Sequence, residues 1–309
     1  MTWTEIKITT SYETSEIVSN FLLELGVNGV LIDDESSQTS INDDLPPVTL
    51  ITHFPTDDLV GSRIAKINEF LKELQVVGLE IKPAQIEIKS IKDEKWAESW
   101  KSAFPPKQIG NRFIVSPRWN QITPYSEQIV IWLDPGMAFG TGYHPTTQLA
   151  LCLLEEVISG GEYVLDIGTG SGILAIAAAK LGANKVIATD IDKTVVPIAR
   201  ENVRINGVEE KIEVVEGNGF ESLSGRYDVI VVNILTKVIL PIIPDCPHYL
   251  KPNGSLIFSG ILEEEMPKIE SAARFNGFHI IKTLTQENWV GVLLSLDRSS
   301  DYARIGNSL

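Results

Sequence analysis

Residues 163–172 read Tyr-Val-Leu-Asp-Ile-Gly-Thr-Gly-Ser-Gly, and residues 173–180 continue as Ile-Leu-Ala-Ile-Ala-Ala-Ala-Lys. A short apolar run is followed by three alternating glycines and then by a stretch of good helix formers. Strand, glycine turn and helix in this order are typical of the opening unit of a doubly wound parallel α/β sheet. Ligands of such sheets bind at the carboxyl ends of the strands, so we expect a binding site beside Gly168.

The spacing of the glycines distinguishes two kinds of ligand. A dinucleotide fingerprint, Gly-x-Gly-x-x-Gly, requires glycine at position 173, where this chain has Ile173. Glycines at 168, 170 and 172, followed by an acidic residue at the end of the next apolar run (Asp190), are typical of enzymes that use S-adenosylmethionine (SAM). Gly168, Gly170 and Gly172 would let the backbone approach the methionine part of SAM, and Asp190 would accept hydrogen bonds from both ribose hydroxyls. A nicotinamide cofactor is the weaker alternative.

Composition limits the classes of function. With 309 residues the chain is long enough for two domains. Its net charge of −15 argues against a nucleic-acid-binding surface and is compatible with a basic protein partner, or with solubility alone. The two cysteines and the absence of a Cys/His cluster predict neither a disulfide framework nor a metal site. The sequence shows neither a secretory signal nor an apolar run of about 18 residues, so we expect a cytoplasmic protein without a membrane span.

Residues 1–91 are predicted to form a small domain in front of the SAM domain. Apolar alternation and helical spacing give the order β-α-β-β-α-β, which is the ferredoxin-like arrangement. A module of this kind usually presents a sheet or an edge to a partner, and a purely structural role is the alternative. Residues 92–110, which contain Trp96 and Trp100 and end at a Pro-Pro pair, are predicted to be a connector helix or linker.

Residues 111–309 are predicted to form the SAM-dependent domain. Strands are expected at 163–167, 185–189, 212–215, 228–232 and 255–259, followed by a hairpin of strands 278–284 and 289–296. Seven strands with a terminal hairpin fit the SAM-methyltransferase variant of the doubly wound sheet. Two further strands, 112–116 and 128–133, are expected before it, joined by a turn.

Three strand ends are expected to converge on one crevice, because parallel strands end at the same edge: Gly168, Asp190 and Asn233. Asn-Ile-Leu at 233–235 stands where amino-group methyltransferases carry an Asn-Pro-Pro-Tyr type motif. A lysine must lose its proton before it attacks a methyl group, which costs about 4.6 kcal/mol at pH 7. The amide oxygen of Asn233 and backbone carbonyls at Ile234 and Leu235 could hold the neutral amine without favouring the ammonium. The alternative is that Asn233 only caps a loop.

Three further residues are candidates beside this crevice. His144 lies in a glycine-rich loop, 134–147, and is either a general base or a residue that fixes the loop. Thr147, at the start of the next helix, could donate its hydroxyl or backbone N–H to the SAM carboxylate, or simply cap the helix. Asp166 could bind the SAM amino group or brace the glycine turn.

The chain resembles the ribosomal protein L11 methyltransferase family (PrmA) in four stretches: Gly-Thr-Gly-Tyr-His-Pro-Thr-Thr (140–147), Val-Leu-Asp-Ile-Gly-Thr-Gly-Ser-Gly-Ile-Leu (164–174), Asp-Ile-Asp (190–192) and Asn-Ile-Leu (233–235). The expected domain order also matches that family along nearly the whole chain. The resemblance implies methylation of lysine ε-amines and of the N-terminal α-amine of ribosomal protein L11, free or on the ribosome, with S-adenosylhomocysteine (SAH) as product. It also implies that the domain of residues 1–91 recognises the substrate. It places the SAM contacts on Thr147, Gly168, Asp190 and Asn233.

Two alternatives to this function stay open. The same SAM domain could methylate RNA or a small molecule, although residues 1–91 lack the basic, aromatic-rich character expected of an RNA-binding domain. The chain could also be a non-catalytic SAM-binding module for ribosome assembly.

Overall fold

The computed structural model describes residues 3–27, 30–33, 48–57, 59–76, 85–91, 104–134, 140–221 and 223–296. Described residues up to Pro105 form one compact unit, and those from Pro106 onward belong to a second. The predicted connector helix with Trp96 and Trp100, and positions 135–139 of the glycine-rich loop, lie outside the described residues.

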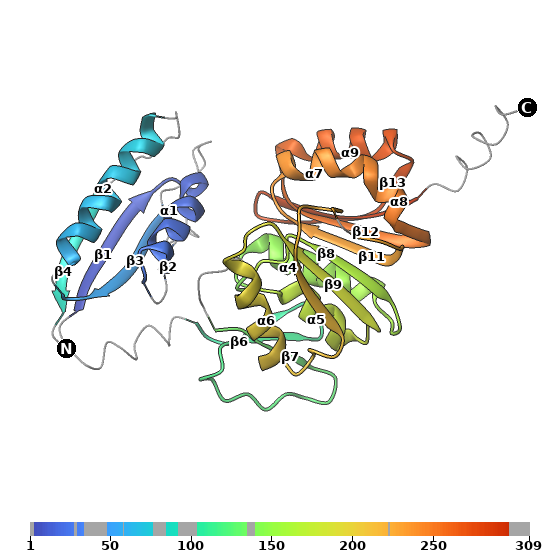
Figure 1. Ribbon diagram of the computed structural model, residues 1–309, viewed down its shortest axis with the longest axis horizontal. Helices are drawn as coiled ribbons and strands as arrows, with labels where there is room; N and C mark the ends of the chain where they lie inside the picture. Colours follow the sequence, from blue (N-terminus) through green and yellow to red (C-terminus); the bar gives the residue numbers. More distant parts are fainter. Residues whose placement is uncertain are drawn as a thin grey trace, which may run out of the picture. The chain divides into compact units, whose positions relative to one another are not determined.

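The first unit is a four-stranded antiparallel sheet with two helices (Figure 1). Strand β1 alternates between buried and half-buried positions, so that Ile6 and Ile8 pack under the helices while Glu5 and Lys7 lie on the opposite face. The strand order β2-β3-β1-β4 confirms the ferredoxin-like arrangement. Its elements are β1 (Trp3–Thr10), α1 (Tyr12–Glu24), β2 (Val30–Asp33), β3 (Val48–Pro55), α2 (Val60–Val76) and β4 (Gln85–Ile91).

The second unit is built on a seven-stranded sheet with the order β10-β9-β8-β11-β12-β14-β13. Neighbours from β10 to β12 run parallel, and β14 runs antiparallel to both β12 and β13. The predicted doubly wound sheet with a terminal hairpin is therefore confirmed. Its strands are β8 (Tyr163–Ile167), β9 (Lys185–Asp190), β10 (Ile212–Glu216), β11 (Tyr227–Asn233), β12 (Leu250–Leu262), β13 (Phe278–Gln286) and β14 (Trp289–Leu296).

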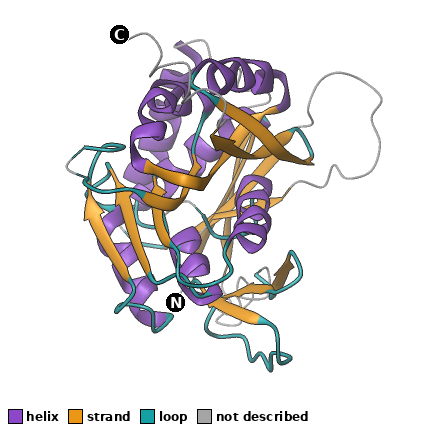
Figure 2. Ribbon diagram, turned by 90° about the vertical axis from the view of Figure 1, so that its right-hand side faces the viewer, coloured by secondary structure: helices purple, strands orange, loops and turns teal. Residues whose placement is uncertain are grey.

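Helices cover both faces of this sheet (Figures 1 and 2). The central strands are almost continuously apolar because each is buried on both sides. One core packs under α4 (Pro145–Val157), α5 (Ile173–Leu181) and α6 (Val195–Ile205). The other packs under α7 (Thr236–Ile242), α8 (Cys246–Tyr249) and α9 (Met266–Phe275). The predicted helix after Asn233 is divided, with the short 3-10 segment η2 (Ile243–Asp245) between α7 and α8 where the prolines stand.

A separate three-stranded sheet precedes the large one. It contains β5 (Lys107–Ile109), β6 (Phe113–Ser116) and β7 (Ile129–Trp132). Residues 107–109 fall within the range predicted to be a connector, yet they form a strand because Ile109 pairs opposite Phe113 and both side chains are buried in the core. Strands β6 and β7 run parallel, so the segment between them is a crossover and not the turn expected from the sequence.

Two smaller features complete the fold. Cys246 is buried and Cys152 is partly buried, and both are free thiols. None of the helices in the described part of the chain is long and apolar enough to span a membrane.

Candidate functional site

The glycine turn after β8 has a backbone that only glycine adopts without strain. Gly168, Gly170 and Gly172 have φ values of 73°, 55° and 85°. The N–H groups of Gly168 and Thr169 donate to the carbonyl of Thr189 at 2.8 and 2.9 Å, which ties the turn to the end of β9. The turn therefore lies at the carboxyl end of β8, where the sequence predicts a binding site.

Asp190 lies at the end of β9, directly beside this turn. Its Oδ2 accepts a hydrogen bond from the N–H of Gly170 at 2.9 Å, and its Oδ1 accepts one from the N–H of Asp192 at 3.0 Å. Each carboxylate oxygen can accept further bonds, so the oriented carboxylate suits a vicinal diol. The next residue, Ile191, is 67% exposed and supplies an apolar surface that the sequence analysis did not single out.

Asp166 is fully buried one strand away. Its Oδ2 accepts hydrogen bonds from Thr169 Oγ1 at 2.6 Å and from the N–H of Ala175 at 3.1 Å, so this oxygen braces the turn. Its Oδ1 accepts no hydrogen bond from any described residue. Burial, reinforced by the nearby charge of Asp190, raises the pKa of the Asp166 carboxyl to about 7. A cationic donor beside Oδ1 would satisfy this oxygen and favour the ionised form.

Asn233 ends β11 and is only 6% exposed. Its Nδ2 donates a long hydrogen bond of 3.4 Å to Thr147 Oγ1 on α4, whereas its Oδ1 accepts none from the described residues. The backbone N–H of Thr147 is already bonded to the carbonyl of His144 at 3.1 Å, so of the two donors considered above only the hydroxyl is left. The structure thus brings Asn233 and Thr147 together, although they are 86 positions apart.

Ile234 and Leu235 continue from Asn233 into α7. A Cβ built on Gly168 would lie 2.7 Å from Ile234 Cγ2, so Ile234 reaches the glycine turn. The carbonyl of Leu235 accepts from the N–H groups of Val238 and Ile239 at 2.8 and 3.2 Å and is committed to the start of α7. The Leu235 side chain is 48% exposed beside the site. Of the two carbonyls predicted to hold an amine, that of Leu235 is thus already used by the helix.

His144 fixes the start of α4. Its Nδ1 accepts a hydrogen bond from the N–H of Thr146 at 3.3 Å, and its ring meets the edge of Trp289 at 5.1 Å between centroids. Burial lowers the pKa of His144 to about 4, so the imidazole is neutral at pH 7. This geometry favours the loop-fixing interpretation of His144 over the general-base one.

The glycine-rich loop is held between two neighbours. Ser171 Oγ donates to the carbonyl of Gly140 at 2.7 Å, and a Cβ built on Gly142 would lie 2.8 Å from Val115 Cγ1. The described end of the loop is therefore packed between the glycine turn and β6.

Sequence reasoning missed two residues within β12 (Leu250–Leu262), Ser259 and Gly260. Ser259 Oγ donates to the carbonyl of Thr146 at 2.8 Å, and Gly260 lies against the backbone of Ile234. The sequence contained a clue to these two residues, because the predicted strand 255–259 ends at the same sheet edge as Asp190 and Asn233.

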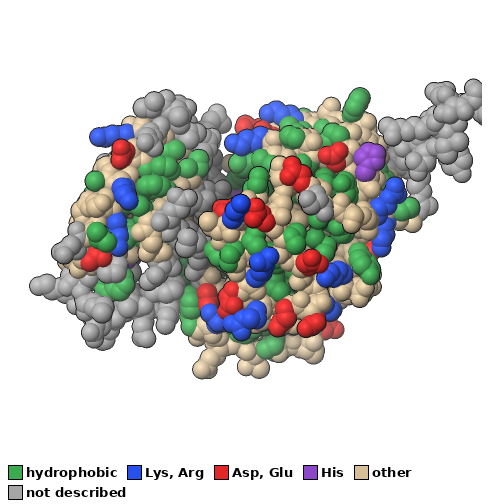
Figure 3. All heavy atoms as spheres, viewed as in Figure 1, with side chains coloured by type: hydrophobic (Ala, Val, Ile, Leu, Met, Phe, Trp, Pro, Cys, Tyr) green, Lys and Arg blue, Asp and Glu red, His purple; other side chains and the backbone are tan. Residues whose placement is uncertain are grey.

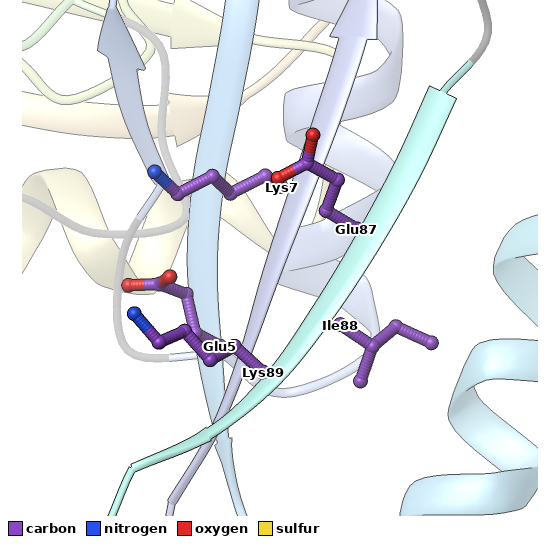
Figure 4. Close-up of a pocket in the computed structure, with 5 residues that line it drawn as sticks. All are labelled: Glu5, Lys7, Glu87, Ile88 and Lys89. Carbon is purple, nitrogen blue, oxygen red and sulfur yellow. The ribbon is translucent and has the colours of Figure 1, made fainter.

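A hollow of about 490 Å³ lies elsewhere, on the sheet of the first unit (Figure 4). It is lined by Glu5, Lys7, Glu87, Ile88 and Lys89. Glu5 stands opposite Lys89, and Lys7 opposite Glu87, so the charges compensate one another in pairs. Over the described residues no group of three His, Cys, Asp or Glu side chains could hold a metal ion. The candidate site for chemistry is therefore the edge of the large sheet.

Comparison with known proteins gives a family match over almost the whole chain. The model of the family "Ribosomal protein L11 methyltransferase (PrmA)" matches residues 2–296. The ribosomal protein L11 methyltransferase of Halalkalibacterium halodurans is 38% identical, over 95% of this chain and 98% of that protein. That of Bacillus subtilis is 36% identical, over 95% of this chain and 99% of that protein. The crystal structure of the ribosomal protein L11 methylase of Lactobacillus delbrueckii subsp. bulgaricus is 39% identical with a TM-score of 0.59, over 62% of this chain and 98% of that one.

Proposed function

This chain belongs to the ribosomal protein L11 methyltransferase family, and we propose that it methylates lysine ε-amines and the N-terminal α-amine of ribosomal protein L11. S-adenosylmethionine, when bound, supplies a methyl group activated by the adjacent sulfonium. We assign substrate recognition to residues 1–91, a connecting role to residues 92–110 and methyl transfer to residues 111–309, and we expect the protein to act in the cytoplasm.

The residues at the sheet edge suit this cofactor. The buried Oδ1 of Asp166 offers an acceptor for an ammonium group, and the oriented carboxylate of Asp190 offers acceptors for a ribose diol. The positive φ values of the glycine turn favour residues without a side chain, so no Cβ atom stands between this backbone and a ligand. We assign cofactor binding to Thr147, Asp166, Gly168, Gly170, Gly172, Asp190 and Asn233.

The observation that carries the proposed reaction is the buried amide oxygen of Asn233, which accepts no hydrogen bond from the described residues. Burying such an acceptor without a partner is costly, and an N–H donor of the substrate would remove that cost. An amide oxygen binds a neutral amine without the negative charge that would keep the amine protonated. Asn233 would therefore orient the nitrogen lone pair, with help from the carbonyl of Ile234, while the exposed Leu235 side chain would contact the carbon chain of the substrate.

Mass spectrometry of ribosomal protein L11 after incubation with the chain and SAM tests this proposal. We expect methylated lysine and N-terminal peptides with the wild-type chain. Asn233→Ala should lower kcat by about a hundredfold, because a buried polar group that orients the reacting atoms typically contributes this much. Its affinity for SAH, measured by calorimetry, should fall much less.

Asn276→Ala is the matched control. Asn276 donates through Nδ2 to the carbonyl of Ala272 at 2.8 Å at the end of α9, so its loss should lower stability and leave kcat unchanged. An Asn233→Ala variant with wild-type kcat would refute the amine-holding role. Labelled methyl groups that appear in RNA and not in L11 would favour the RNA alternative.

A further inference from the structure

Strand β12 carries a β-bulge at the site. Phe258 pairs with Val292 and Ile261 pairs with Val290, so β12 has one residue more than β14 between these pairs. Gly260 lies within the bulge with a φ of 82°. Bulges with a glycine in the left-handed region occur next to active sites, where they bend the strand and redirect side chains.

Gly260 faces the backbone of Ile234. A Cβ built on Gly260 would overlap the carbonyl oxygen of Ile234 and would lie 2.8 Å from its carbonyl carbon and 3.1 Å from its nitrogen. Gly168 approaches the same residue from the end of β8. The peptide of Ile234 therefore lies where it does because Gly260 has no side chain.

Ser259 lies beside Asn233 on the neighbouring strand β12. It is the register partner of Asn233 on β12, and its buried Oγ donates to the carbonyl of Thr146 at 2.8 Å. The next residue, Thr147, accepts the hydrogen bond of Asn233 Nδ2. Gly291, on β14 between the two pairs that flank the bulge, lets α4 come close, since a Cβ there would lie 3.0 Å from Leu149 Cβ.

We propose that the Ser259–Gly260 bulge positions the amine-holding group, a role that rests on the function proposed above. Gly260 sets the place of the Ile234 carbonyl, and Ser259 sets the place of Thr147 and through it the Asn233 amide. Both are positioning residues, because they act on the acceptor amine through Ile234 and Asn233. A displacement of about 1 Å at such a group costs about a hundredfold in rate. The bulge should therefore affect kcat far more than the affinity for SAH.

Gly260→Ala tests this role against Gly225→Ala. Gly225 has a similar φ of 89°, and a Cβ built there meets no atom within 4 Å in the described structure. Both variants carry the strain of alanine at a positive φ, and only Gly260→Ala displaces Ile234. We expect Gly260→Ala to lose about a hundredfold in kcat toward L11 while its calorimetric affinity for SAH falls much less. Gly225→Ala should keep the wild-type kcat and the wild-type affinity for SAH. It should resemble Gly260→Ala only in its lowered thermal stability.

A second variant covers the case in which Gly260→Ala does not fold. Ser259→Ala removes one hydroxyl and leaves the backbone unstrained, and we expect its kcat to fall about tenfold, as for the loss of one buried hydrogen bond. The positioning role would be overturned if Gly260→Ala folds and has the wild-type kcat. If Gly260→Ala does not fold, a wild-type kcat in Ser259→Ala would overturn it instead. Failure of the wild-type chain itself to methylate L11 would instead overturn the proposed function.

Discussion

At the scale of single residues, the two oxygens of the buried Asp166 carboxyl have different surroundings. One of its oxygens braces the glycine turn through Thr169 and Ala175, while the other accepts no hydrogen bond from described residues. Its pKa is raised from 3.8 to about 7, chiefly by burial. Ionised Asp166 therefore destabilises the ligand-free chain at neutral pH, and a bound ammonium group would offset that cost.

Asp166→Asn should change stability in a pH-dependent way. Between pH 3.8 and about 7 the folded chain holds a proton on Asp166 that the unfolded chain has released. The contribution of this group to the free energy of unfolding thus falls as pH rises through that window and stays low above it. Asp166→Asn does not undergo this loss of stability. The melting temperature of the variant minus that of wild type should therefore be larger at about pH 8 than at about pH 5.

The same variant should bind SAH more weakly, because it lacks the charge that we propose attracts the ammonium group. Melting curves at several pH values and calorimetry with SAH check both effects. A melting-temperature difference that is constant with pH would contradict the assigned shift of Asp166.

At the scale of elements, side chains of α6 and its end link the three-stranded sheet of β5, β6 and β7 to the glycine turn after β8. Asn206 ends α6, where its Nδ2 donates to the carbonyls of Trp132 and Asn202 at 2.8 and 2.9 Å, and its Oδ1 accepts from the N–H of Trp132 at 2.9 Å. Asn202 in turn donates to the carbonyl of Ser171 in the glycine turn at 2.8 Å. Strand β7 and the glycine turn are thus joined through the side chains of one helix.

Asn206→Ala should destabilise the chain by about 2 kcal/mol, because it leaves the peptide groups of Trp132 without their partner. Urea unfolding measures this change. Asn218→Ala is a suitable control, since Asn218 is exposed and donates a side-chain hydrogen bond to exposed Glu221 at 3.2 Å, and its loss should cost less than about 0.5 kcal/mol. Equal stabilities of the two variants would contradict the linking role of Asn206.

At the scale of the whole molecule, the chain carries a net charge of −15. Figure 3 shows Lys and Arg side chains interspersed with Asp and Glu on the visible face of the second unit. The second unit contains ion pairs such as Lys185–Glu213 at 3.2 Å and Lys251–Asp228 at 2.8 Å. Exposed pairs of this kind contribute little to stability, so the net charge acts mainly at long range on partners.

A basic protein substrate should therefore associate faster at low salt. We expect kcat/KM for L11 to fall as ionic strength rises from about 0.05 to about 0.5 M, where the Debye length becomes shorter than about 10 Å. The affinity for SAH, which carries no net charge, should change little over the same range. A kcat/KM independent of salt would show that the acidic charge does not contribute to substrate capture.

The sequence by itself determined the sheet and the residues at its edge. Strand, glycine turn and helix are encoded by neighbouring residues, and β8, α5 and β9 follow that local pattern closely. Parallel strands end at one edge, so Gly168, Asp190 and Asn233 could be placed together before any coordinates.

Only the tertiary structure decided how that edge is supported. Ser259 contacts Thr146 across 113 positions, Gly260 faces Ile234, and Ile109 joins the core from a segment predicted to be a linker. His144 caps α4 with a neutral ring, and Asp166 keeps its proton to about pH 7, because burial sets both pKa values. Burial and contacts between distant residues depend on packing, and packing leaves no periodic pattern in the sequence.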